Sequence, residues 1–374
     1  MAGLYLHIPF CKKACTYCDF HFSTSLQKKP DLVAAMQVEL RDASKDWEKE
    51  IFESVYFGGG TPSLLDAKEL GDLMQSIKQY YRLSDKPEIT FEINPEDVNE
   101  QNLALWKILG INRLSIGIQA FQDEFLAWMN RAHNSEMAIS AVKKAQSGGF
   151  DNISIDLIYG IPGLDLKQWE NNVAKALDLG VQHISCYAFT VEDRTKLAKE
   201  LEGGNIIMPK DELVLEQFDL LSAMAEERGF EHYEISNLSL PGKASKHNSN
   251  YWSRKSYLGI GPSAHSFSGN QRWWNIRSNQ GYIKAITAGT SYKESETLSE
   301  KDVFNETIMT QLRTSSGVST ALWIDSGESP KNILQNQEIR ELYSEELIYL
   351  ESSRIKLTQK GRHLADGIAA RLFK

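Results

Sequence analysis

Short apolar runs alternate with longer amphipathic segments through the first part of the chain. The apolar runs are rich in β-branched and aromatic side chains, which is typical of buried strands, whereas the segments between them repeat apolar residues at helical spacing. We expect strands at residues 4–9, 54–57, 88–93, 113–118, 153–158 and 183–189. We expect helices at about 30–48, 64–81, 98–109, 122–147, 165–179 and 211–228.

Six successive strand–helix units predict an α/β fold. Strands that alternate with helices form parallel sheets with right-handed crossovers, and six such units tend to curl into a barrel or part of one. We therefore expect a partial (β/α)6 barrel over residues 1–230.

The pattern changes after residue 230. Residues 231–298 are rich in Gly, Ser, Asn and aromatic residues and show few helical repeats, so we expect a loop-rich extension that covers the mouth of the barrel. Residues 299–374 are polar and helical again. They predict a small, mostly helical C-terminal domain with a short hairpin, of winged-helix-like character.

Composition narrows the class of protein. The 374 residues include 41 basic and 50 acidic side chains, a net charge of −9, which disfavours a broad nucleic-acid-binding surface. Hydrophobic residues make up 41% of the chain, enough for a buried core. No run approaches the ~18 apolar residues of a membrane span, and the first residues lack the pattern of a signal peptide. These features predict a cytoplasmic protein.

Three of the four cysteines stand close together, as Cys11, Cys15 and Cys18 in a C-x3-C-x2-C pattern directly after the first strand. Such a group cannot serve as the disulfide framework of so large a chain, and it indicates metal or redox chemistry. Three thiolates can hold three irons of a [4Fe-4S] cluster and leave the fourth iron open to a substrate. Zinc is the alternative, and it would need a fourth ligand, for which His21 is the nearest candidate.

Glycines and polar residues mark the ends of the other strands. They are Gly58, Gly59, Gly60 and Thr61 after the second strand, Glu92 in the third, Gln119 after the fourth and Asp156 in the fifth. Because the carboxyl ends of parallel strands meet on one face of a barrel, we expect these residues to lie beside the cysteines.

This combination resembles the radical S-adenosylmethionine (SAM) superfamily. The resemblance implies that the open iron chelates the amino and carboxylate groups of SAM, and that the reduced cluster cleaves SAM to a 5′-deoxyadenosyl radical. It also implies that Gly59 and Gly60 contact the methionine moiety and that Tyr17 lies near the adenine. Taken alone, the glycines could form an ordinary tight turn and Tyr17 could serve packing.

Longer runs resemble the oxygen-independent coproporphyrinogen III oxidase family over nearly the whole chain. They are YLHIPFC at 5–11, YFGGGTP at 56–62, RLSIGIQ at 113–119 and IDLIYGIP at 155–162. The resemblance implies SAM contacts from positions that could otherwise be hydrogen-bonding residues at the barrel mouth. These are Tyr5, Gly59, Thr61, Glu92, Gln119, Arg131 and Asp156.

Two branches of this family differ near the cysteines. The oxidases carry a further cysteine two residues after the third and a longer amino-terminal segment, whereas this chain has Phe20 at that position and ten residues before Cys11. His247 begins an H-N-x-x-Y-W motif that resembles the haem chaperone branch, where this histidine is implicated in haem binding. Imidazole is a common axial ligand of haem iron, although a single histidine in a polar loop is more often a hydrogen-bonded surface residue.

The resemblance therefore implies a haem chaperone that carries a [4Fe-4S] cluster, SAM and haem, and that passes haem to acceptor proteins of unknown identity. The alternative is an oxygen-independent coproporphyrinogen III oxidase, a radical-SAM oxidative decarboxylase, with which every barrel motif is compatible. A radical enzyme for another substrate is a third hypothesis. The sequence does not fix the number of chains, and it is compatible with a homodimer.

Overall fold

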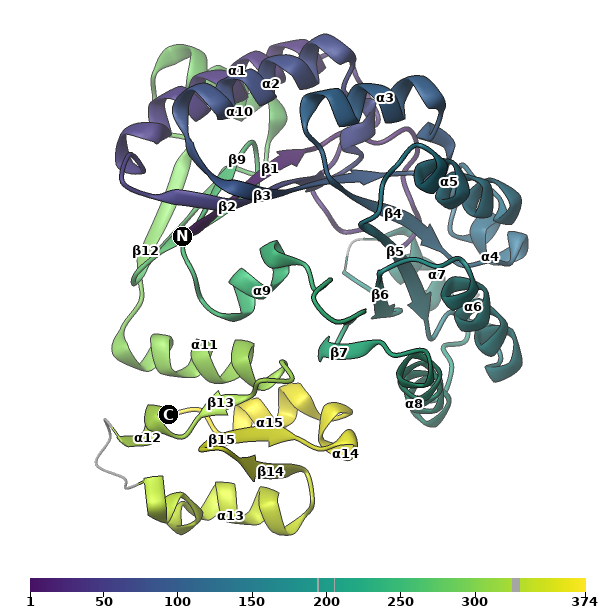
Figure 1. The fold of residues 1–374 in the computed structure, drawn as a ribbon, viewed down its shortest axis with the longest axis vertical. Coiled ribbons are helices and arrows are strands. Elements are labelled where there is room, and N and C mark those ends of the chain that lie inside the picture. The colour runs from purple at the N-terminus through teal and green to yellow at the C-terminus, as the bar shows by residue number, and fades with distance from the viewer. Residues whose placement is uncertain (194, 205, 325–329) are drawn as a thin grey trace.

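The computed structural model describes residues 1–193, 195–204, 206–324 and 330–374. A curved sheet forms the larger part of the molecule, with helices along its convex side, and a smaller C-terminal domain lies below it in Figure 1. Among the described residues the main sheet has 12 strands, in the order β12-β11-β10-β9-β1-β2-β3-β4-β5-β6-β8-β7.

The centre of the sheet is the predicted partial barrel. Strands β1 to β6 run parallel and are separated by helices, which confirms the predicted α/β class. The strands are β1 (Ala2–Ile8), β2 (Ile51–Gly59), β3 (Arg82–Ile93), β4 (Arg113–Gln119), β5 (Ile153–Tyr159) and β6 (His183–Ala188). The helices are α1 (Lys29–Ala43), α2 (Ala67–Tyr80), α3 (Glu100–Leu109), α4 (Asp123–Trp128), α5 (Ser135–Ser147), α6 (Leu166–Asp178), α7 (Lys196–Glu202) and α8 (Asp211–Glu227), with 3-10 turns η1 (Ser44–Asp46), η2 (Pro62–Leu64) and η3 (Pro95–Asp97).

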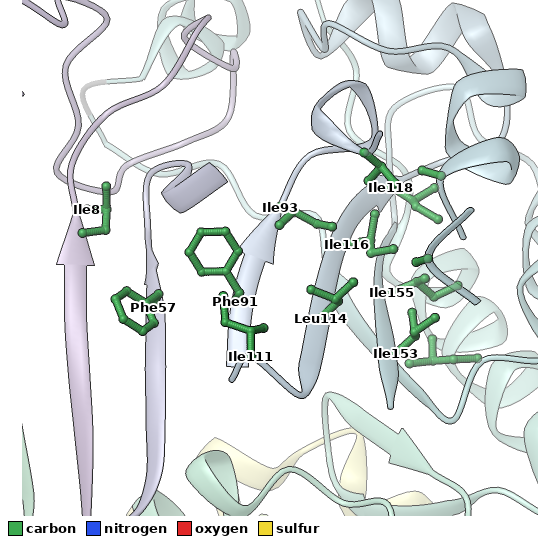
Figure 2. Close-up of a cluster of buried hydrophobic side chains, with 14 of the residues drawn as sticks. Ile8, Phe57, Phe91, Ile93, Ile111, Leu114, Ile116, Ile118, Ile153 and Ile155 are labelled. Atoms are coloured by element: carbon green, nitrogen blue, oxygen red, sulfur yellow. The ribbon is translucent and has the colours of Figure 1, made fainter. Parts of the chain in front are cut away.

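Side chains alternate between the two faces of the barrel strands. Leu114 and Ile116 of β4 are fully buried in the apolar layer that Figure 2 shows, together with Phe57 and Phe91 of the neighbouring strands. Burying each such side chain contributes roughly 1.5–3 kcal/mol. Because neighbouring residues of a strand point to opposite faces, the intervening positions of β4 face the concave side. Those positions are Arg113, Ser115 and Gly117, so the concave face is polar.

The prediction of one helix over 122–147 is wrong in its middle, where the structure separates α4 from α5. Asn130 has a φ of 60°, a left-handed conformation that a continuing helix does not contain. Asn134 is the N-cap of α5 and accepts a hydrogen bond from Met137 N (2.9 Å). The break places Arg131 in the turn between the two helices.

The expected loop-rich extension over 231–298 also contains short strands and helices. The segment forms β7 (Glu231–Glu234), β8 (Asn237–Ser239), α9 (Lys246–Trp252), β9 (Tyr257–Ile260), β10 (His265–Ser268), β11 (Gln271–Asn275), α10 (Asn279–Ala288) and β12 (Lys293–Thr297). β8 pairs antiparallel with β6, and β9 pairs parallel with β1. These strands have three to five residues each, too few to show a clear period in the sequence.

A buried carboxylate ties this segment to the barrel. Glu39 of α1 is fully buried and accepts hydrogen bonds from Gly261 N (2.8 Å) and Asn275 Nδ2 (2.9 Å). Tyr282 of α10 donates to Oε2 (2.5 Å), the oxygen that also accepts from Gly261 N, and Lys293 Nζ lies 3.6 Å from Oε1. One acid therefore joins α1 to four residues of the segment that follows the barrel.

The C-terminal domain has its own apolar core and a sheet in the order β13-β15-β14. Its elements are α11 (Glu300–Leu312), β13 (Val318–Ser319), α12 (Ala321–Ile324), η4 (Pro330–Gln335), α13 (Gln337–Ser344), β14 (Ile348–Glu351), β15 (Arg354–Leu357), α14 (Gln359–Arg362) and α15 (Ala365–Arg371). Glu306 of α11 pairs with Arg254 and with Arg272 (2.7 Å), which anchors the domain to the main sheet. No helix among the described residues is long and apolar enough to cross a membrane.

Candidate functional site

A cavity of about 600 Å³ lies at the carboxyl ends of the barrel strands. The predicted site residues that line it are Cys11, Cys15, Tyr17, Cys18, Gly59, Gly60, Thr61, Glu92, Gln119, Arg131 and Asp156. The other two, Tyr5 and His247, are not part of its wall. Among the described residues that line the cavity none belongs to 231–298, and coverage of the mouth by this segment stays a prediction.

The three cysteines of the loop after β1 are free and half-buried. Cys11 N donates to Ser23 O (3.1 Å) and Cys18 N to Cys15 O (3.4 Å), which holds the loop against the barrel rim. Burial raises the pKa of the Cys11 thiol to about 11, and burial with the neighbouring cysteine charge raises the pKa of Cys18 as well. A metal centre that binds thiolates would offset this cost.

The donors fit an iron–sulfur cluster better than a single zinc ion. His21, the expected fourth zinc ligand, hydrogen-bonds through Nε2 to Asn279 Oδ1 (2.7 Å) and does not line the cavity. Three half-buried thiols on one wall match the cysteine set of a [4Fe-4S] cluster with one open iron.

The glycine turn after β2 brings backbone against the cysteine loop. Gly59 has a φ of 104°, and a Cβ there would lie 2.4 Å from His7 Nδ1. A Cβ at Gly60 would lie 2.6 Å from Phe10 O, so neither position can carry a side chain without rearrangement. Thr61 N donates to Phe10 O (2.7 Å), which joins the turn to the segment before Cys11.

Arg131 reaches the cavity from the turn between α4 and α5. Its Nη2 donates to Gly117 O (2.7 Å) and Asn94 Oδ1 (2.8 Å), and its Nη1 lies 3.5 Å from Cys15 Sγ. Asn94 Nδ2 in turn donates to Thr61 Oγ1 (3.3 Å). The Nε of Arg131 is buried without a partner among the described residues. It therefore remains a donor for a ligand in the cavity.

Two partly buried carboxyl groups, Glu92 and Asp156, line the cavity. Glu92 accepts hydrogen bonds from Tyr56 Oη (2.7 Å) and Gly59 N (3.2 Å), and Asp156 accepts one from Ser115 Oγ (3.3 Å). Burial raises the pKa of Glu92 to about 7, with a smaller effect of the Asp156 charge, and burial raises the pKa of Asp156 to about 6. Such acids can accept hydrogen bonds from hydroxyl groups or pair with an ammonium group.

Gln119 and Tyr17 complete the wall. Gln119 has a φ of 73° at the end of β4, a conformation that costs a residue other than glycine on the order of 1–3 kcal/mol. The ring of Tyr17 lies 6.1 Å from that of Phe189, and burial raises its pKa well above the usual range. Strained residues gather at functional sites more often than elsewhere, which agrees with the position of Gln119.

Tyr5 lies on the concave face below the cavity. Its hydroxyl hydrogen-bonds with His7 Nδ1 (3.0 Å), and its ring centroid is 6.1 Å from that of Tyr56. Direct contact between Tyr5 and SAM therefore stays a prediction.

The expectation that His247 stands in a polar loop is wrong. The residue belongs to the first turn of α9 and is only 3% exposed. Its Nδ1 hydrogen-bonds with Ser54 Oγ (3.0 Å) and its ring stacks on Tyr56, with centroids 5.0 Å apart. Nε2 has no hydrogen-bond partner in the structure described. Burial lowers the pKa of His247 to about 3, so the imidazole is neutral.

The sequence and a buried acid explain why α9 forms there. Ser245 is the N-cap and accepts a hydrogen bond from Asn248 N (3.3 Å). Glu88 of β3 accepts hydrogen bonds from Lys246 N and His247 N (both 3.1 Å), a favourable place for a carboxylate at a helix amino terminus. Since Ser54 and Glu88 lie early in the parallel parts of β2 and β3, His247 lies toward the amino-terminal end of the barrel, away from the cysteines.

Sequence reasoning did not single out Arg113 and Ser115 as site residues. Ser115 lines the cavity, and Arg113 lies two residues before it on the same face of β4. The signal was present in RLSIGIQ, where polar and small residues alternate with apolar ones. In a barrel strand this alternation separates concave-facing from core-facing positions.

Comparison with known proteins agrees with this geometry. The family model of the radical SAM superfamily matches residues 5–176, and that of the HemN C-terminal domain matches residues 298–364. A protein named heme chaperone HemW from Bacillus subtilis is 31% identical over 98% of both chains, and one from Mycobacterium tuberculosis (strain H37Rv) is 32% identical over 99% of this chain and 94% of its own. The solved structure of coproporphyrinogen III oxidase (HemN) from Escherichia coli is similar with a TM-score of 0.84, over 99% of this chain and 89% of that one, at 20% identity.

Proposed function

The chain belongs to the radical SAM superfamily, among its HemN-like members, and on that premise we propose that it is a haem chaperone. It binds haem and passes it to acceptor proteins. The name that relatives of nearly equal length carry supports this proposal.

The cavity is the proposed site of the cluster and SAM. Cys11, Cys15 and Cys18 would hold three irons, and the open iron would face the cavity. When bound, the cluster supplies an electron to the sulfonium of SAM. Arg131 offers its free Nε to the SAM carboxylate, and Glu92 offers acceptors to hydroxyl or ammonium groups.

The unpaired nitrogen of His247 carries the haem part of the proposal. When Nδ1 donates to Ser54 Oγ, the Nε2 lone pair is free, and this is the form that binds haem iron. The rings of Tyr56 and Tyr251 lie 5.0 and 5.4 Å from the imidazole and could contact the porphyrin.

Haem binding requires a movement of α9. Because His247 is 3% exposed and buried against β2, iron can reach Nε2 only when the helix leaves the concave face. The seven-residue α9 is short enough to move as a unit. We infer that the described conformation is the haem-free one.

A haemin titration tests the proposal. Protein with a reconstituted cluster should shift the haemin Soret band at a one-to-one ratio, and His247→Ala should weaken binding at least about tenfold. His265→Ala is the matched control, since this histidine is exposed on β10. A wild-type protein without a Soret shift would exclude haem binding, and a His247→Ala variant with wild-type affinity would exclude this ligand.

Oxidative decarboxylation of coproporphyrinogen III is the alternative function. The structure of HemN shares the fold, and the cavity is compatible with SAM chemistry. Phe20, at the position of the further oxidase cysteine, lines the cavity and is 70% exposed. Anaerobic incubation with SAM, a reductant and coproporphyrinogen III should give no protoporphyrinogen; product formation beside an active control would favour the oxidase.

A further inference from the structure

Arg113, the first residue of β4, is a buried cation without a direct partner. The residue is 2% exposed, its Nε is buried without a hydrogen-bond partner, and across the described ranges no carboxylate forms an ion pair with its guanidinium. A guanidinium has five N–H donors, and a buried charge without partners is strongly unfavourable. Such a group calls for a compensating ligand.

Arg113 lies on the concave face at the start of β4. The titratable groups that its charge influences are Tyr56, Glu92, Asp156, His183, Tyr233 and His247. Glu92 and Asp156 form no ion pair with it, and their oxygens already accept hydrogen bonds from Tyr56, Gly59 and Ser115. The two acids therefore attract the guanidinium only from a distance.

Other buried polar atoms near Arg113 also lack partners. Thr90 is paired with Arg113 in the β3–β4 ladder, and its hydroxyl has no hydrogen bond among the described residues. The same holds for His247 Nε2 and, one turn along α9, for Asn250 Nδ2. Buried polar groups in native proteins are almost always paired, so this group of atoms indicates a ligand that completes them.

We propose that Arg113 binds a propionate carboxylate of the haem whose iron binds to His247. The planar fork of a guanidinium matches a carboxylate in two parallel hydrogen bonds, and the Thr90 hydroxyl can donate a third. Haem carries its carboxylates at the ring edge and its iron at the centre, so one molecule can present an acid to one residue and a metal to another. This inference rests on the proposed function and adds the residue that recognises the acid side chain.

A movement of α9 would open part of the concave face of the sheet. Leu114, next to Arg113 in sequence, and Ile116 belong to the apolar core that Figure 2 shows, so Arg113 faces the opposite, concave side of β4. On the concave side Thr90 pairs with both Arg113 of β4 and Tyr56 of β2, and the Tyr56 ring stacks on His247 of α9. Displacement of α9 would free the imidazole and the concave face beside Tyr56, two strands away from the guanidinium.

The test compares haemin with its dimethyl ester, in which both propionates are neutral. Protein with a reconstituted cluster should bind haemin about ten- to a hundredfold more tightly than the ester, as expected for a charge-assisted pair. In Arg113→Gln the two affinities should become equal. Arg113→Lys keeps the charge without the fork and should retain part of the preference, and it serves if Arg113→Gln does not fold.

Arg41→Gln is the control, because Arg41 is exposed on α1 and pairs with its neighbour Asp42. It should keep the full preference for haemin. Equal binding of both porphyrins by the wild type, or an unchanged preference in Arg113→Gln and Arg113→Lys, would overturn the inference while leaving haem binding intact. Failure of the wild type to bind either porphyrin would instead overturn the proposed function.

Discussion

At the residue scale, the cavity keeps two acids where burial opposes their ionisation. Glu92 and Asp156 have pKa values of about 7 and about 6, both raised mainly by burial. A ligand with a positive charge would favour their ionised forms. The ligand-free fold therefore carries an electrostatic cost near neutral pH that binding of a cation can offset.

Glu92→Gln tests this cost through the pH dependence of stability. Because folding raises the pKa of Glu92, its contribution is fully present below the unfolded value near 4.5 and is lost as the pH rises through about 7. Without cluster and SAM, the variant should be more stable than the wild type by on the order of 1–3 kcal/mol at pH 8, with little difference at pH 4.5. Urea unfolding at both pH values measures this. Equal midpoints at pH 8 would contradict the raised pKa.

Residues could be predicted where local spacing fixes their role. The C-x3-C-x2-C pattern and the glycine turn gave Cys11 and Gly59, which share the cavity. The burial of His247 could not be predicted, since it depends on Ser54 and on contacts far apart in the sequence. The unpaired state of Arg113 could not be predicted for the same reason, because it is seen only when the positions of all its neighbours in the fold are known.

At the element scale, Glu39 is the main polar tie between the barrel and the strands added beside β1. Its carboxylate receives donors from three separate positions after residue 260. Burial raises the pKa of this acid, whereas the donors and Lys293 act in the opposite direction. Removing the acid would leave several donors buried without an acceptor.

Glu39→Ala should therefore lower the free energy of unfolding by about 3–5 kcal/mol, the usual cost of breaking a buried charged network. Glu48→Ala, an exposed acid that follows α1, is the matched control and should change stability by less than about 0.5 kcal/mol. Thermal and urea unfolding of both variants measure the difference. A Glu39→Ala protein as stable as the control would show that the hydrogen bonds of Glu39 do not contribute to stability.

The second element of interest is α9. If haem binding displaces it, amide hydrogens of residues 246–252 should exchange at least about tenfold faster in the haem-loaded protein. Those of α10, which packs on α1 instead, should be unchanged. Hydrogen exchange with mass spectrometry, in the wild type and in His247→Ala, measures this. Slower exchange in α9 on haem binding would contradict the displacement.

Helices and strands with a clear repeat of apolar residues could be predicted from the sequence, whereas the short strands could not. The six barrel strands and their helices stood out because their apolar faces are continuous. The strands β7 to β12 are short and lie at the sheet edges, so their pattern depends on pairing with β6 and β1. The break between α4 and α5 depends on the left-handed Asn130, which no helical period reveals.

At the scale of the whole molecule, the concave face connects two different sites. The cysteine cavity lies at the carboxyl ends of the strands, and α9 with His247 lies toward their amino ends. Between them, Tyr56 stacks on His247 and donates to Glu92, which lines the cavity. A chain of contacts from His247 through Tyr56 to Glu92 thus connects the proposed haem ligand with the proposed SAM site.

The claim on which both sites depend is a cluster with one open iron, held by Cys11, Cys15 and Cys18. Electron paramagnetic resonance of the anaerobically reconstituted and reduced protein tests it most directly. We expect a [4Fe-4S] signal that changes on addition of SAM, unaffected in Cys186→Ala, whose thiol is buried in β6, and lost in Cys11→Ala. Bound zinc in place of iron, or a cluster signal that SAM leaves unchanged, would contradict the claim.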